Sequence, residues 1–190
     1  GMDFAVDLVH TTVPGSSMTD PVYDVHSNVV SCVRWLPELS GTALKRIVYV
    51  SSGGTVYGPP MSNPVDERHP TEPTCSYGIT KLAIEKYIAM YAQLGGFDYR
   101  ICRPSNVYGE GQRLNIAQGI IGVYLNRVTE GKPVEVWGNG KQVRDYLYVG
   151  DMVKAVAALI RHEGRSRLFN ISTGRGYSIN DIISIMRETL

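Results

Sequence analysis

Two side chains capable of acid–base chemistry lie four residues apart in this 190-residue sequence. Tyr77 and Lys81 stand in segment 73–94, whose apolar residues recur at helical spacing. Residues four apart in a helix lie one above the other, so this phenol and this ammonium are expected to meet. A nearby cation favours the phenolate, which predicts that Lys81 lowers the pKa of Tyr77. Such a phenol can act as a general base and then as a general acid, although two residues at this spacing also occur by chance.

The helix that would carry this pair has recognisable ends and one marked apolar stripe. Residues 73–76 are typical of a helix start, and the glycines at 95–96 are typical of an end. The stripe consists of Ile79, Ala83, Tyr87, Met90 and Leu94. A second helix is predicted over 21–39, with Asp20 as its N-cap and proline at its first position. Its apolar face would be Val22, Val25, Val29, Val33 and Leu36.

Three apolar segments rich in β-branched residues predict strands, and two of them run into loops of small residues. We expect strands at 5–13, 46–52 and 99–103, with the loops at 51–58 and 104–111. Strands that alternate with helices favour an α/β fold, with a Rossmann-like parallel sheet and helices on both faces. Ligands of such sheets bind at the carboxyl ends of the strands, so the site is expected there.

Composition narrows the class of protein. The formal net charge is +1, so no strong field favours nucleic acid, a membrane surface or acidic partners. The three cysteines lie far apart and the four histidines form no cluster, so neither set supports a metal site. No apolar run is long enough to cross a bilayer, and no signal peptide is visible. We therefore expect a cytoplasmic protein that binds no nucleic acid, membrane or metal.

Four short motifs follow one another along the chain. They are TVYG at 55–58, YGITK at 77–81, RPSNVYGEGQ at 103–112 and VRDYLYVGD at 143–151. Together they resemble the extended short-chain dehydrogenase/reductase family, in its branch of NAD-dependent nucleotide-sugar epimerases and dehydratases and closest to UDP-glucose 4-epimerase-like members. The resemblance covers nearly all of the chain. It implies that a sugar carbon of a nucleotide-sugar substrate is oxidised transiently by NAD and then reduced from its other face.

The resemblance also implies roles for single residues. Tyr77 is similar to the family's catalytic base, Lys81 to its ribose-binding lysine, and Asn28 to the asparagine that completes the proton-handling group. Taken alone, Asn28 would be better interpreted as a solvated helix residue. The cofactor would be lined by Thr11, Thr12, Val13, Ser51, Ser52, Pro104 and Ser105, together with Tyr77 and Lys81.

Substrate contacts are implied at two positions further along. Asn106 and Arg144 correspond to substrate-binding residues, and Arg144 would bind the diphosphate, because its fork of donors matches phosphate oxygens. Without the resemblance, an ion pair between Arg144 and Asp145 would be the simpler interpretation.

The chain departs from the family pattern at the loop after the central strand. The family has serine or threonine where Gly53 stands, and that hydroxyl binds the substrate oxygen on which the tyrosine acts. Thr55 could replace it, since strand-like spacing returns a side chain to the same face. Ser52 is the weaker alternative. Dehydratases of the family carry an acidic pair where Gly54 and Thr55 stand, which favours an epimerase here.

A second departure concerns the extent of the chain. It holds no G-x-x-G-x-x-G motif, the loop that seats the cofactor pyrophosphate on a helix N-terminus. We expect a fragment truncated at both ends: 1–113 as a partial NAD-binding Rossmann-like domain, and 114–190 as a partial substrate-binding lobe interleaved with the last strands. Such a fragment would not retain NAD. It could also be an inactive binding or dimerisation remnant. We expect a homodimer or larger oligomer, built on the helices around Val29 and Tyr87.

Overall fold

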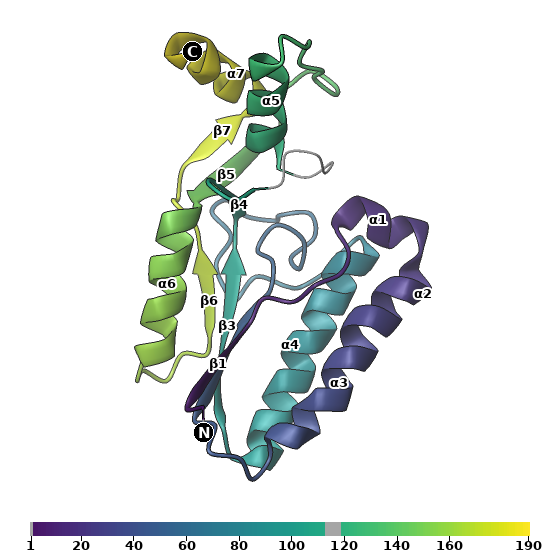
Figure 1. Ribbon diagram of the computed structural model, residues 1–190, viewed down its shortest axis with the longest axis vertical. Helices are drawn as coiled ribbons and strands as arrows, with labels where there is room; N and C mark the ends of the chain where they lie inside the picture. Colours follow the sequence, from purple (N-terminus) through teal and green to yellow (C-terminus); the bar gives the residue numbers. More distant parts are fainter. Residues whose placement is uncertain (1, 113–118) are drawn as a thin grey trace. The chain divides into compact units, whose positions relative to one another are not determined.

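The computed structural model of the chain describes residues 2–112 and 119–190 (Figure 1). The chain divides into two compact units. The first comprises Gly1–Pro104 and Lys154–Ile171, and the second comprises Ser105–Val153 and Ser172–Leu190. The division expected from the sequence lies between residues 113 and 114, where a cofactor-binding domain would meet a substrate-binding lobe. That division stays a prediction.

Four parallel strands form the sheet of the first unit, in the order β1–β2–β3–β6. Their bounds are Phe4–Asp7, Arg46–Val50, Asp98–Pro104 and Leu168–Ile171. Because all four strands are parallel, their carboxyl ends meet at one edge. The predicted parallel sheet is confirmed. The first strand is shorter than predicted, and a short helix, α1 (Pro14–Thr19), precedes the helix predicted over 21–39.

Helices cover both faces of this sheet (Figure 1). On one face lie α3 (Ser31–Trp35) and α4 (Ser76–Gly95), with α1 and α2 (Pro21–Asp24) beside them. The part of α6 (Val149–Arg161) that belongs to the first unit lies on the other. The apolar core between the sheet, α3 and α4 contains Cys32, Leu36, Ile47, Tyr49, Ile84, Ile88, Ala92, Phe97 and Ile101.

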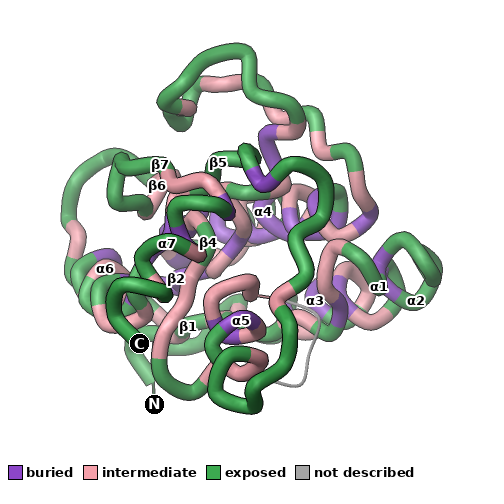
Figure 2. Tube along the Cα trace, turned by 90° about the horizontal axis from the view of Figure 1, so that it is seen from above, coloured by how far each residue is buried: buried purple, intermediate pink, exposed green. Residues whose placement is uncertain are grey.

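Helix α4 is the helix predicted around Tyr77, but its predicted apolar stripe does not face the core. The residues that do are Ile84, Ile88 and Ala92, and Figure 2 marks these buried stretches of α4. The helix therefore has two apolar faces, about 140° apart at 100° per residue, and the spacing rule selected the more exposed one. Its members, exposed by 36% to 73%, are Ile79, Tyr87, Met90 and Leu94.

The helix predicted over 21–39 forms, with a change of winding inside it. Asp20 caps it by accepting a hydrogen bond of 2.9 Å from the backbone N–H of Tyr23. A π-helical stretch, η1 (Val25–Val30), follows α2, and a 3-10 turn, η2 (Leu36–Leu39), follows α3. A π turn holds one residue more than an α turn, so it rotates the apolar stripe. Val22 and Val25 are consequently exposed, whereas Val29 and Leu36 pack against the core.

The second unit is built on a smaller sheet. Strand β5 (Val143–Tyr148) pairs in parallel with β4 (Asn106–Tyr108) and antiparallel with β7 (Gly176–Ser178). Helices α5 (Ile120–Thr129) and α7 (Ile179–Thr189) accompany it. Helix α7 begins with a capping box: the backbone N–H of Asp181 donates to Ser178 Oγ at 3.1 Å, and Asp181 accepts from the N–H of Ser178 at 2.8 Å.

The described residues contain neither a membrane-spanning helix nor a group of side chains suited to a metal ion. Across 2–112 and 119–190, no helix has the length and apolar content needed to cross a bilayer. In the same ranges, no three or more His, Cys, Asp or Glu side chains are grouped so that they could hold a metal ion.

Candidate active site

Tyr77 and Lys81 meet near the start of α4, as their spacing predicted. The Lys81 ammonium nitrogen lies 5.7 Å from the centroid of the Tyr77 ring. The first turn of the helix is fixed from α1, because the backbone N–H of Tyr77 donates to Ser17 Oγ at 3.0 Å. Tyr77 is half-buried, whereas Lys81 is only 3% exposed. The pair is thus positioned by packing as well as by helical spacing.

The electrostatic effect predicted for this pair is not found. Burial, together with smaller contributions from Cys75 and the Asp24 carboxylate, raises the pKa of Tyr77 to about 12. Burial also lowers the pKa of Lys81 to about 8, against nearby carboxylates that include Asp7. The prediction that Lys81 lowers the pKa of Tyr77 is therefore wrong for this chain, because desolvation of the phenolate outweighs the attraction of the ammonium.

Lys81 lies at the carboxyl end of β2 and has donors to spare. Its Nζ donates to the carbonyl oxygen of Val50 at 2.9 Å and lies 5.1 Å from the ring centroid of Tyr49. An ammonium has three donors, and Val50 supplies the hydrogen-bond acceptor found for it among the described residues. A buried ammonium with unused donors can bind hydroxyl groups of a ligand, such as those of a ribose.

The loop after β1 is tied to η1 through Asn28. This side chain is 5% exposed, so the interpretation of Asn28 as a solvated helix residue is wrong. Its Oδ1 accepts from the backbone N–H of Thr11 at 2.9 Å, and its Nδ2 donates to a carboxylate oxygen of Asp24 at 2.9 Å. Thr12 donates its hydroxyl to the same carboxylate, and Val13 is the N-cap of α1.

Asp24 is the residue that the sequence reasoning missed. It is fully buried, and its carboxylate accepts side-chain hydrogen bonds from Thr12, Asn28, Ser76 and Thr80. Burial raises the pKa of this carboxyl, but the hydrogen bonds from Ser76, Thr12 and Thr80 outweigh burial and hold its pKa below the usual value. The i, i+4 spacing of Asp24 and Asn28, and of Ser76 and Thr80, was the signal available in the sequence.

His10 lies between Asp24 and Tyr77. Its ring meets the Tyr77 ring edge-on at a centroid distance of 4.6 Å, and its Nε2 is 3.6 Å from an Asp24 oxygen. Both ring nitrogens are buried and have no hydrogen-bond partner among the described residues. Burial and, to a smaller extent, the Lys81 charge lower the pKa of His10 to about 4, against the opposing effect of Asp24. The sequence showed no cluster of histidines, and so gave no reason to single His10 out.

A buried ion pair holds the end of β2 and β3 to α4. The Arg103 guanidinium donates to both oxygens of Glu85, at 2.9 and 2.6 Å, and Ser51 donates its hydroxyl to the same carboxylate. The guanidinium also lies 4.7 Å from the centroid of the Tyr57 ring. Ser51, predicted to bind the cofactor, therefore donates its hydroxyl hydrogen to a side chain of the protein itself. Whether it also contacts a cofactor stays a prediction.

The loop after β2 approaches α4 and β3 closely. A Cβ on Gly78 would lie 2.8 Å from the Thr55 carbonyl oxygen, and one on Gly53 would lie 3.0 Å from the Pro104 carbonyl oxygen. The Gly53 N–H donates to that Pro104 oxygen at 2.8 Å. Residues 53–57 form turns and bends, so the strand-like spacing invoked for Thr55 is wrong. Its hydroxyl oxygen is nonetheless buried and has no hydrogen-bond partner among the described residues.

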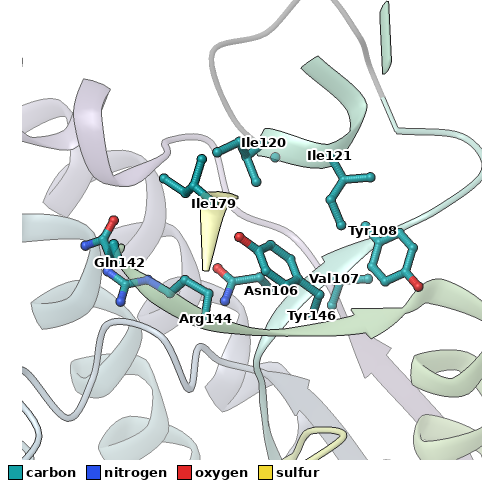
Figure 3. Close-up of a pocket in the computed structure, with 10 residues that line it drawn as sticks. Asn106, Val107, Tyr108, Ile120, Ile121, Gln142, Arg144, Tyr146 and Ile179 are labelled. Carbon is teal, nitrogen blue, oxygen red and sulfur yellow. The ribbon is translucent and has the colours of Figure 1, made fainter. Parts of the chain in front are cut away.

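The second unit contains a pocket of about 200 Å³ above its sheet. Figure 3 shows Arg144 and Gln142 at one end, Asn106 and Tyr146 in the middle, and Tyr108 at the other end. Helical residues, among them Ile120, Ile121 and Ile179, close the apolar side. The pocket thus offers one cation and two amides beside an aromatic and aliphatic wall.

Arg144 and Asp145 do not form the ion pair that we considered from the sequence. Arg144 is exposed, and its side chain donates to the carbonyl oxygen of Val143 at 3.1 Å. Asp145 instead accepts from Ser105 Oγ at 2.6 Å and from the Thr173 hydroxyl at 2.8 Å. Since neighbouring residues of a strand point to opposite faces, the Arg144 guanidinium is free of Asp145.

The chain matches the NAD dependent epimerase/dehydratase family over residues 1–172. It belongs to that family. A UDP-glucose 4-epimerase of Mycolicibacterium smegmatis is 34% identical over 158 residues, which cover 83% of this chain and 50% of that protein. The dTDP-4-dehydro-6-deoxyglucose reductase of Escherichia coli is 34% identical over 186 residues, covering 97% of this chain and 58% of that protein.

The fold is confirmed by a solved member of the family. The UDP-glucose 4-epimerase of Thermotoga maritima, solved with UDP-glucose, superposes with a TM-score of 0.92 at 30% identity. The match covers 98% of this chain and 60% of that structure. This chain therefore spans about half to three-fifths of the length of these relatives.

The described residues fit NAD, the dinucleotide after which the family is named. Lys81 keeps donors for hydroxyl groups, and Thr55 presents an unpartnered buried hydroxyl near the same strand end. Thr11 and Val13 use their backbone N–H groups within the protein, on Asn28 and on Ser16. A contact between the 11–13 loop and the cofactor would thus have to use other atoms of this loop.

Proposed function

We propose that this chain carries the acid–base residues of an NAD-dependent nucleotide-sugar epimerase that acts on a UDP-sugar. The observation that supports this most strongly is that Tyr77 and Lys81 meet at the carboxyl edge of the sheet, while Asn28 is joined to the first turn of their helix through Asp24. They come from a helix start and a π turn that are 49 residues apart in the chain, so short-range sequence preference alone does not bring them together.

The proposed roles follow from the chemistry of these groups. Tyr77 takes the proton of a sugar hydroxyl and returns it after the sugar has turned over. Lys81 holds ribose hydroxyls of NAD and brings positive charge to the phenol. Thr55 replaces the hydroxyl missing at Gly53 and orients the substrate oxygen. NAD, when bound, supplies the hydride acceptor.

The raised pKa of Tyr77 sets a requirement for this function. A phenol with a pKa of about 12 keeps its proton at neutral pH and is a poor base. Turnover therefore needs additional positive charge beside Tyr77, which an oxidised nicotinamide would add to that of Lys81. The apolar setting of the site strengthens such an attraction, because the local dielectric is low.

We propose that Asn106 and Arg144 bind the nucleotide diphosphate in the second unit. The guanidinium of Arg144, which is not paired with Asp145, and the amide of Asn106 line one pocket. A guanidinium is suited to phosphate oxygens. Ser105 is a further candidate at the cofactor, although its hydroxyl is bonded to Asp145.

We also propose a homodimer formed through the exposed face of α4. Ile79, Tyr87, Met90 and Leu94 form an apolar stripe in contact with solvent, which is the pattern of an interaction surface. Sedimentation at micromolar concentration tests this. A dimer that dissociates on the double substitution Tyr87→Lys with Met90→Lys is expected, and a wild type that sediments as a monomer contradicts the proposal.

The function is tested by interconversion of UDP-glucose and UDP-galactose in the protein that carries this chain, with NAD supplied. Tyr77→Phe is expected to abolish turnover while leaving the fold and substrate binding intact, since it removes one oxygen. Near-normal turnover in Tyr77→Phe would remove this residue from the role. Formation of a 4-keto product without epimerisation would favour a dehydratase.

Whether the chain holds NAD distinguishes a catalytically inactive remnant from a chain with a complete cofactor site. Purified chain is denatured, and the supernatant is assayed for NAD. We expect none from the 190 residues alone, because they lack the glycine fingerprint that seats a pyrophosphate. One NAD per chain would contradict this expectation and support an active site that is complete for the cofactor.

A further inference from the structure

The carboxylate of Asp24 joins three segments that meet at Tyr77. Its donors come from the loop after β1 (Thr12), from η1 (Asn28) and from the first turns of α4 (Ser76 and Thr80). The two α4 donors flank Tyr77 in the sequence. Any shift of Asp24 would therefore move the turn that carries this phenol.

Among residues 2–112 and 119–190, no arginine or lysine lies at ion-pair distance from Asp24, although the charge of Lys81 interacts with it over a longer range. Within the described residues, His10 is the basic side chain at ion-pair distance, 3.6 Å away, and it resists protonation in this buried setting. The donors to Asp24 are hydroxyls and an amide, which stabilise the negative charge without cancelling it. The charge of the carboxylate thus persists beside the site.

We propose that Asp24 is a positioning residue for Tyr77, which fixes the first turn of α4 and holds a negative charge close to the phenol. The inference rests on the proposed function only in treating Tyr77 as the acid–base group. The titratable groups near Tyr77 are Lys81 from α4, Cys75 at its N-cap, Tyr49 from β2, His10 from the loop after β1, and Asp24 itself. Lys81 attracts a phenolate, and Asp24 opposes it.

The test replaces Asp24 by asparagine, which keeps the shape, one acceptor and a donor, and removes the charge. The reporter is 3-fluorotyrosine placed at position 77 by amber suppression and followed by fluorine NMR. Fluorine makes the phenol more acidic, so its titration finishes before alkaline unfolding. In Asp24→Asn we expect the titration midpoint to fall by about 1 pKa unit. Asp66→Asn, an exposed carboxylate replaced in the same way, is the control and should leave the midpoint in place.

A carboxylate with a purely structural role gives a different result. A folded Asp24→Asn chain with an unchanged midpoint would overturn the proposal, as would a higher midpoint. Should Asp24→Asn fail to fold, the carboxyl carbon of Asp24 is titrated in the wild-type chain by carbon-13 NMR. A pKa below that of a free aspartate supports the ionised anchor, and a pKa at or above it overturns the proposal. Both readouts leave turnover aside, so failure of the epimerase assignment would not affect them.

Discussion

Two aspartates of the first unit collect several side chains each, and they do so with opposite chemistry. Asp98, at the start of β3, accepts from Arg46 at 3.1 Å, from Arg100 at 2.7 Å and from Arg167 at 3.0 Å. Asp24, by contrast, is held by three hydroxyls and one amide. One carboxylate is surrounded by full positive charges, and the other by neutral donors.

The difference follows from what each end of the sheet has to do. Arg46 and Arg100 also donate to the carbonyl oxygens of Ile160 and His162, where α6 ends. Asp98 thereby neutralises part of a buried cationic cluster and locks helix to strands. At the carboxyl edge, the neutral donors leave the negative charge of Asp24 in place beside Tyr77, next to the ring nitrogens of His10, which have no hydrogen-bond partner among the described residues. We infer that partner type separates a structural carboxylate from one that can influence a reacting group.

The largest effect is expected from Asp98→Asn. This change leaves the buried guanidiniums of Arg46 and Arg100 without their counter-charge, which costs about 3 kcal/mol of unfolding free energy. Urea denaturation followed by circular dichroism measures it. Asp66→Asn is the matched control, because Asp66 pairs with the solvent-exposed Arg68, and such exposed pairs contribute little to stability. Equal losses in the two variants would show that the Asp98 cluster is not structural.

His10 should give the next largest effect, as a dependence of stability on pH. Its pKa is about 4 in the folded chain and about 6.5 when unfolded, so between these values only the unfolded chain binds the proton. Stability therefore falls as pH falls from about 6.5 to about 4, by up to about 3 kcal/mol. Urea midpoints at pH 7 and pH 4.5 should lie closer together in His10→Gln than in wild type.

The exposed His26 serves as the control for this pH dependence. Its ring is open to solvent in the folded chain, as in the unfolded one, so His26→Gln should keep the wild-type difference between the two pH values. If His10→Gln keeps that difference as well, protonation of His10 does not limit the fold at acid pH. The view of Asp24 as a carboxylate with no cation beside it would then need revision.

Asp24→Asn should destabilise the chain by less than Asp98→Asn, by about 1–2 kcal/mol. Asparagine can still accept one hydrogen bond and can donate to the hydroxyls of Ser76 or Thr12, so neutral donors are re-satisfied where guanidiniums are not. The same urea series measures both variants. A larger loss for Asp24→Asn than for Asp98→Asn would reverse the comparison.

Much of this frame could be predicted from the sequence, because periodicity and small-residue loops report local structure. The helix of Tyr77, its meeting with Lys81 and the parallel sheet all follow from spacing. Desolvation does not, since it depends on what the rest of the fold places around a side chain. The predicted lowering of the Tyr77 pKa was therefore wrong, since burial raises it. Asp24 escaped notice for a related reason: its donors lie up to 56 residues away.

The smallest expected effect, Thr80→Val, tests how the hydroxyl donors share Asp24. Thr80 is 1% exposed, and its hydroxyl lies 3.2 Å from the carboxylate and 3.0 Å from the Tyr77 carbonyl oxygen. Valine keeps the volume and removes one donor of several, so we expect a loss of about 1 kcal/mol and a higher pKa for Asp24. Thr42→Val, at an exposed turn, should change neither. An unchanged Asp24 pKa in Thr80→Val would mean that this hydroxyl spends its proton on the helix, and that Asp24 is held by the other donors.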